Sequence, residues 1–73
     1  MTPFVIALDD AQGRLLSVSS ASNRREAAVL LRHAMTRPTG DGTRLQVTQA
    51  KRVLFDWTKV AGHWWYTDAR GQT

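Results

Sequence analysis

The sequence predicts a small α+β domain, in which four or five strands form an antiparallel sheet and one α-helix packs on one face of it. Two short β-rich segments separated by a turn come first, and one amphipathic segment with start and stop signals follows. Alternating and aromatic segments then complete the chain. A single helix and a small sheet each have one apolar face to bury, so packing one on the other is the simplest arrangement. The expected order is strand, strand, helix, and then two or three strands.

The first two strands are expected to form a hairpin. Residues 3–8 (PFVIAL) are rich in β-forming side chains and predict a mostly buried strand. The following DDAQG segment has turn chemistry, because Asp bonds its own backbone and Gly supplies a positive φ. Residues 14–19 (RLLSVS) predict the returning strand, with Leu16 and Val18 on one face and Leu15 exposed or at an edge.

The helix is expected over residues 24–36. Asn23 and Glu26 give an Asn-x-x-Glu variant of the capping box at its start. Arg37 and Pro38 end it, because proline lacks a donor and disfavours helix in the residue before it. Four apolar residues at positions i, i+3, i+4 and i+7 share one face, namely Ala27, Leu30, Leu31 and Ala34.

The last part of the chain predicts further strands. Residues 38–42 (PTGDG) are expected to form a flexible loop. Residues 43–48 (TRLQVT) alternate polar and apolar side chains, which predicts a strand with Leu45 and Val47 facing inward. Residues 63–67 (HWWYT) predict the final strand.

Residues 49–57 fit two interpretations. A helix would place Ala50, Val53, Leu54 and Trp57 on one face, whereas a strand would do so for Val53, Phe55 and Trp57. The β-branched and aromatic content, with a turn expected at Ala61–Gly62, favours a strand hairpin. Residues 69–73 are expected to be a frayed tail.

Size and charge limit the function classes. The 73 residues suffice for a single domain over 1–73, without disulfides because there is no cysteine. The longest apolar runs, residues 4–8 and 27–31, are far shorter than the ~20 residues that span a bilayer, so no membrane association is expected. The net charge of +4 comes mainly from arginine and favours an anionic partner, although solubility alone explains it equally well.

Catalytic and metal-binding motifs are not evident in the sequence. His33 and His63 are far apart, and there is no cysteine to accompany them. The glycines at Gly40 and Gly42 lack the Lys-Ser/Thr of a phosphate loop and are interpreted as loop flexibility. We therefore expect neither an enzyme, nor a cofactor, nor a bound metal.

The C-terminal third carries all three tryptophans among cations. Adjacent strand residues point to opposite sides, so Trp64 and Trp65 are expected to lie on opposite faces, with Tyr66 on the side of Trp64. One indole would then join the core and the other would be exposed for recognition. The alternative is that Trp57, Trp65 and Phe55 simply fill the core.

A recognition surface is predicted from aromatic and cationic side chains, which are frequent interface anchors. They can equally stack on single-stranded bases and contact phosphates. The candidate partner-binding residues are Arg52, Lys59, Trp64, Trp65 and Tyr66, with Arg24 and Arg25 as secondary candidates. Edge strands at residues 3–8 or 63–67 are a further means of pairing with an extended partner segment.

The chain resembles the small basic proteins by which bacterial viruses take over host RNA polymerase, such as a transcription regulator of a Xanthomonas-infecting phage. The likeness is carried by residues 4–14 (FVIALDDAQGR) and 23–31 (NRREAAVLL), together with length and charge. It includes no motif by which functional residues can be carried over. The resemblance implies a non-enzymatic inhibitor that binds polymerase near the RNA exit path, blocks promoter use and suppresses termination.

Three hypotheses follow for the function. The leading one is a phage-type regulator that binds host RNA polymerase in the bacterial cytoplasm as a monomer and can contact nascent RNA. The second is a single-stranded nucleic-acid-binding module. The third is a phage inhibitor of another host complex, such as a defence system.

Overall fold

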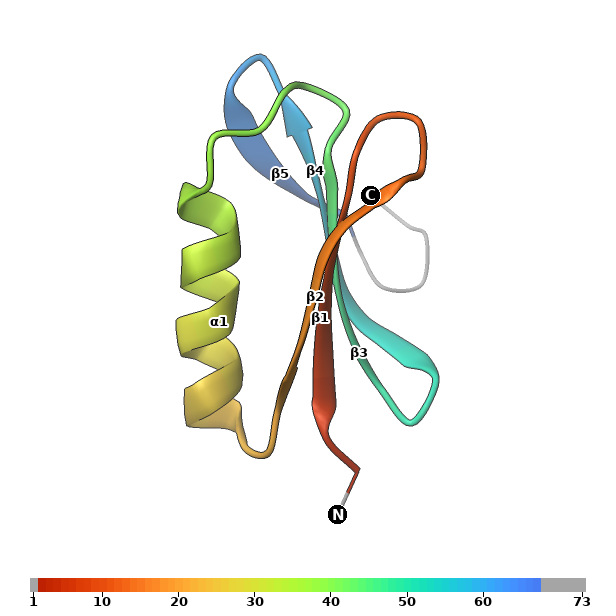
Figure 1. The fold of residues 1–73 in the computed structure, drawn as a ribbon, viewed down its shortest axis with the longest axis vertical. Helices are drawn as coiled ribbons and strands as arrows, with labels where there is room; N and C mark the ends of the chain where they lie inside the picture. Colours follow the sequence, from red (N-terminus) through yellow and green to blue (C-terminus); the bar gives the residue numbers. More distant parts are fainter. Residues whose placement is uncertain (1, 68–73) are drawn as a thin grey trace.

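One α-helix lies on one face of a five-stranded antiparallel sheet (Figure 1), which confirms the expected α+β class and element order. The structure is a computed structural model, and it describes residues 2–67; the tail expected at 69–73 lies outside this range. The helix has 13 residues, and no helix in the described range is long and apolar enough to cross a membrane. The elements are β1 (Phe4–Asp9), β2 (Leu15–Ala21), α1 (Arg24–Thr36), β3 (Arg44–Gln49), β4 (Arg52–Val60) and β5 (His63–Thr67).

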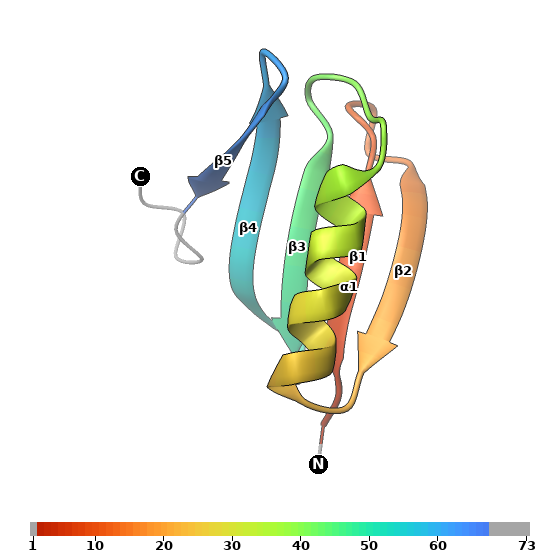
Figure 2. The ribbon, with the colours of Figure 1, turned by 90° about the vertical axis from the view of Figure 1, so that its left-hand side faces the viewer.

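The strand order in the sheet is β2-β1-β3-β4-β5. Both β2 and β3 pair antiparallel with β1, so they run in the same direction, and α1 carries the chain across the face of β1 between them. Figure 2 shows α1 in front of the β1 side of the sheet, with β4 and β5 beside the helix rather than beneath it. The C-terminal hairpin therefore extends the sheet beyond the helix.

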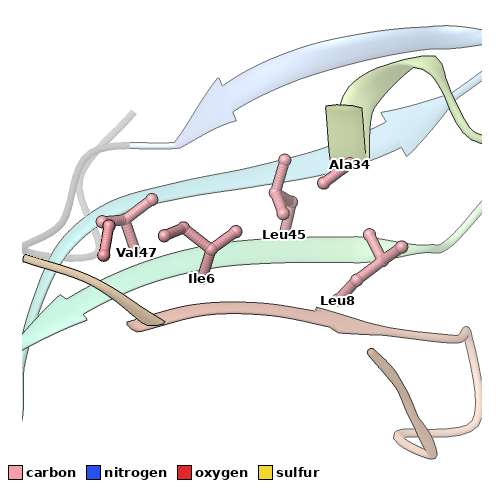
Figure 3. Close-up of a cluster of buried hydrophobic side chains, with 6 residues drawn as sticks. Ile6, Leu8, Ala34, Leu45 and Val47 are labelled. Carbon is pink, nitrogen blue, oxygen red and sulfur yellow. The ribbon is translucent and has the colours of Figure 1, made fainter. Parts of the chain in front are cut away.

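The core lies between α1 and the central strands. The buried apolar side chains are Ile6, Leu8, Ala21, Ala34, Leu45 and Val47 (Figure 3). Leu8 and Leu45 are cross-strand neighbours and are both 0% exposed. Fully burying a leucine stabilises a fold by about 1.5–3 kcal/mol. The helix packs its predicted stripe against this cluster and adds Met35 to it.

Both ends of α1 are where the sequence places them. The Asn23 side chain accepts a hydrogen bond from the Glu26 backbone N–H at 2.9 Å, which satisfies one of the unpaired donors of the first turn. The Glu26 carboxylate accepts a hydrogen bond from the Ser22 hydroxyl at 3.2 Å. Arg37 is extended, with φ −69° and ψ 142°, and it ends the helix before Pro38.

The outer strand β2 turns two of its serines toward the helix. Ser17 and Ser19 are cross-strand neighbours of the buried Leu8 and Ile6, so they share the buried face. Leu16 and Val18 are exposed instead. The larger apolar side chains of β2 are thus on the surface, because the pairing with β1 sets which positions of β2 face α1.

Of residues 49–57, the structure has residue 49 at the end of β3, a turn at 50–51 and strand β4 from residue 52 on, so the strand interpretation is confirmed for 52–57, but the faces differ from the expectation. Val47 pairs with Phe55 and Thr48 pairs with Val53, so Leu54 is an extra residue that forms a β-bulge. The bulge breaks the two-residue alternation. Val53 therefore lies on the opposite face from Phe55, and the prediction that they share a face is wrong.

Two tight turns connect the last three strands. The expected turn at Ala61–Gly62 is confirmed, with φ values of 52° and 79° between the paired residues Val60 and His63. The second turn is at residues 50–51, which also have positive φ values of 53° and 65°. Positive φ at both central positions defines the turn type that matches the twist of a hairpin.

The loop between α1 and β3 is tied down, which corrects the expectation of flexibility. The Gly42 N–H donates to the Lys59 carbonyl oxygen at 2.8 Å, and the Lys59 N–H donates to the Thr43 carbonyl oxygen at 2.9 Å. An Asp41 carboxylate oxygen accepts a hydrogen bond from the Gly62 N–H at 3.0 Å. Each tie reaches β4 or the β4–β5 turn, so the loop fixes that hairpin to the end of the helix.

Candidate binding surface

Three aromatic rings form a cluster on the helix side of β4 and β5. Trp57 and Tyr66 are cross-strand neighbours with ring centroids 5.6 Å apart, and Phe55 stacks on Trp57 with centroids 5.7 Å apart. Phe55 is 44% exposed and Tyr66 is 54% exposed, whereas Trp57 is half-buried. We call Phe55, Trp57 and Tyr66 the aromatic cluster. Because α1 lies beside it (Figure 2), the cluster presents contiguous apolar surface to solvent.

Trp64 holds β5 to the helix. Its indole Nε1–H donates a hydrogen bond to the Met35 carbonyl oxygen at 3.1 Å, and the ring packs against the core. Lys59 lies next to it, with Nζ 5.7 Å from the ring centroid, and donates a hydrogen bond to the Thr39 hydroxyl at 3.2 Å. Both candidate residues thus have internal partners, so their first role in this structure is to shape the hairpin.

Trp65 points to the other face of the sheet. It is the cross-strand neighbour of Thr58, whereas Trp64 is the neighbour of Lys59, so the two indoles lie on opposite faces as expected. Trp65 is 61% exposed. The alternative that Trp65 and Phe55 fill the core is therefore wrong, because both side chains are exposed.

A groove of about 640 Å³ separates α1 from β3 and β4. It lies along the first half of the helix and is open to solvent. Its lining residues are Phe4, Arg24, Ala27, Ala28, Leu31, Val47, Gln49, Leu54 and Phe55. Ala27 and Ala28 have short side chains, so the helix leaves the space in front of β3 and β4 unfilled. The β-bulge allows Leu54 and Phe55, although adjacent in sequence, to line the same groove.

The candidate cations are distributed along this side of the molecule. Arg24 lines the groove, and Arg25 is exposed beside it on the helix. Arg52 is the cross-strand neighbour of Gln49, which lines the groove, so Arg52 belongs to the same face of the sheet. Lys59 is at the far end of β4. The predicted residues therefore do not form one surface: Arg24, Arg52 and Tyr66 lie on the helix side and Trp65 lies behind the sheet.

Arg44 is neutralised internally. Its guanidinium donates two hydrogen bonds to Asp56, Nη2 to Oδ2 at 2.6 Å and Nε to Oδ1 at 3.1 Å. Hydrogen bonding to this carboxylate, and then its charge, raise the pKa of Arg44 above its ordinary value. Asp56 is buried. Between residues 2 and 67 this is the only ion pair, so no carboxylate of that range contacts Arg24, Arg25 or Arg52.

Sequence reasoning missed several residues of this surface. Phe55 was considered only in the alternative that it fills the core, and Leu54, Ala28 and Gln49 were not considered as binding residues. The adjacent small residues Ala27, in the apolar stripe, and Ala28, at its edge, were the available signal, because short side chains there leave space beside the helix.

Comparisons with known proteins add no assignment. No family model, no curated protein and no solved structure matches this chain. Within the range that the structure describes, no three metal-ligating side chains gather together. The geometry of the groove and aromatic cluster, with the resemblance stated above, supports the proposals that follow.

Proposed function

We propose that this protein acts by stoichiometric binding, as a phage-type regulator of host RNA polymerase that inhibits initiation and suppresses termination. The observation that carries the binding role is the aromatic cluster, which lies uncovered beside a groove whose charged lining residue is Arg24. Aromatic and arginine side chains that a partner can desolvate supply most of the energy at protein interfaces. Phe55 and Tyr66 are exposed enough to be buried by such a partner.

The identity of the partner is supported by the resemblance of residues 4–14 and 23–31 to polymerase-binding phage proteins. These residues occupy β1, the following turn and the first half of α1, and the part of them in α1 forms the helix side of the groove. They would set the shape of the surface, while β4 and β5 supply the contacts. Arg52 and Tyr66 on those strands are the contacts that we favour.

Purified bacterial RNA polymerase tests the proposal directly. The full chain should co-purify with it at low salt, reduce transcripts from a promoter and increase read-through at a terminator. Tyr66→Ala and Arg52→Ala should each weaken binding by about tenfold, because each removes an exposed anchor. Val18→Ser is the matched control, since Val18 is also exposed but lies on β2. Absence of co-purification at low salt would exclude polymerase as the partner.

Single-stranded nucleic acid is the second candidate, and the exposed Trp65 favours it. An uncovered indole on a sheet face can stack on a base, with about 1–3 kcal/mol per stacked base. This function predicts quenching of tryptophan fluorescence by oligothymidylate, which weakens steeply as salt rises and disappears in Trp65→Ala. Quenching that is absent or insensitive to salt argues against it. Inhibition of another host complex, such as a defence system, uses the same surface and differs only in the partner captured.

A further inference from the structure

We propose that the groove between α1 and the β3–β4 pair binds an acidic segment of a partner protein. An apolar side chain of that segment would pack over Val47 and Leu54, and a carboxylate would bind Arg24. This inference rests on the proposed binding function and adds the chemistry of the segment that is bound.

The shape of the groove follows from how the sheet curves relative to the helix. Figure 1 shows the β4–β5 hairpin leaning toward the C-terminal end of α1, while the β3–β4 turn lies away from the helix. The hydrogen bond from Trp64 to Met35 holds the closed end. Toward the open end the helix lines the groove with the short side chains of Ala27 and Ala28. The resulting volume of about 640 Å³ is within the ~300–1,000 Å³ typical of ligand pockets.

The charge of the groove selects an acidic partner. Arg24 is the one charged residue among those lining it, and Arg52 lies on the same sheet face beside Gln49. Glu26, the acidic residue of the first helical turn, accepts a hydrogen bond from Ser22 and does not line the groove. A guanidinium binds a carboxylate through two parallel hydrogen bonds, which fixes orientation as well as adding energy.

The rest of the lining favours a peptide over a nucleic acid. Most of it is aliphatic, from the two alanines together with Leu31, Val47 and Leu54. Such walls suit the side chain of a leucine or phenylalanine. A nucleic-acid strand needs a row of cations along its phosphates and open aromatic faces for its bases. Here one cation lines the groove, a second, Arg52, lies beside it, and of the aromatic cluster only Phe55 is in the lining.

A displayed library of random twelve-residue peptides, selected on the full-length protein, is the probe. We expect the selected peptides to carry Asp or Glu within a few residues of Leu, Phe or Trp. Ala28→Leu fills the groove with a good helix former at an exposed position, and it should weaken the selected peptides by about tenfold or more. Val29→Leu is the control on the same helix, since Val29 is exposed and does not line the groove. Arg24→Gln should weaken acidic peptides and not their amide counterparts.

The same variants separate this inference from the polymerase assignment. If polymerase does not bind the unmodified chain while acidic peptides still require Ala28, the groove inference holds and polymerase is excluded. A second outcome would overturn the groove inference while the polymerase assignment stands. In it, the Ala28→Leu variant binds both polymerase and the selected peptides as tightly as the unmodified chain does. Basic or purely apolar selected peptides, or their displacement by oligothymidylate, would also overturn it.

Discussion

The indole of Trp64 caps the C-terminal end of the helix through the carbonyl oxygen of Met35. The last four carbonyls of an α-helix have no partner within the helix. Two others find one locally, since the His33 oxygen accepts from the Thr36 hydroxyl and the Ala34 oxygen accepts from the Arg37 N–H. The Met35 carbonyl oxygen instead accepts its hydrogen bond from β5, a strand distant in sequence. The Trp64 side chain thereby caps the helix and also positions the C-terminal hairpin.

Removing this cap should destabilise the fold. Trp64→Ala should lower the free energy of unfolding by about 3 kcal/mol, at the low end for a tryptophan because the ring is only half-buried. Trp64→Phe keeps most of the packing and loses the hydrogen bond, so about 1–2 kcal/mol is expected. Urea unfolding measures both. Trp65→Ala is the control and should cost under about 0.5 kcal/mol at its exposed position; equal losses at both tryptophans would contradict this account.

Two glycines with similar backbone angles should respond differently to alanine. Gly13 has φ +82° and open space where a Cβ would be, so Gly13→Ala should cost about 1–2 kcal/mol from backbone strain alone. Gly42 has φ +86°, and a Cβ there would lie 2.7 Å from the Ala11 Cβ. Gly42→Ala should therefore cost about 1–3 kcal/mol more. Thermal unfolding of the two variants tests the difference, and equal costs would mean that the loop moves aside freely.

The turn at Ala50 and Lys51 stores backbone strain that a substitution can release. Both residues have positive φ, a conformation that costs about 1–2 kcal/mol for a residue with a Cβ. Lys51→Gly should raise the free energy of unfolding by about 1 kcal/mol. Lys51→Ala removes the charge and keeps the strain, so it should have little effect. Chemical denaturation of both variants checks this, and a destabilised Lys51→Gly would show that the lysine side chain has a role of its own.

The Arg44–Asp56 pair should stabilise the sheet independently of pH over the neutral range. Arg44→Ala leaves a buried carboxylate without its donor, which should cost about 1–3 kcal/mol. Asp56 raises the pKa of Arg44 in the folded state, so this contribution is fully present below the unfolded pKa and is lost only as pH rises through the folded value. The difference in unfolding free energy between the two proteins should stay constant from neutral to mildly alkaline pH. A steady decline over that range would point to another titrating group.

The helix could be predicted from the sequence because several local signals indicate the same element. The spacing of Ala27, Leu30, Leu31 and Ala34, the Asn23 cap and the stop at Pro38 all indicate one element, and the structure has it at Arg24–Thr36. The opposite placement of Trp64 and Trp65 followed from strand parity alone. Strand parity could not predict which of the two indoles is exposed, because that depends on which face of the sheet the helix covers.

The features that the sequence did not predict are those that depend on contacts between elements distant in the chain. The β-bulge at Leu54 has no sequence signal, yet it moves Val53 away from Phe55 and builds one wall of the groove. The turn at Ala50–Lys51 lacks the glycine or asparagine that marks such turns. The groove itself depends on the angle between helix and sheet, which no local pattern encodes.

Because α1 packs mainly on β1 and β2, the hairpin of β4 and β5 is held to the helix only near its turn, where Trp64 bonds Met35. Amide protons near Leu8 and Leu45 should exchange with solvent only when the whole domain unfolds, whereas those of the edge strand β5 should exchange through local opening. Binding of a partner to β5 should therefore slow the uptake of deuterium by the backbone amides of this strand.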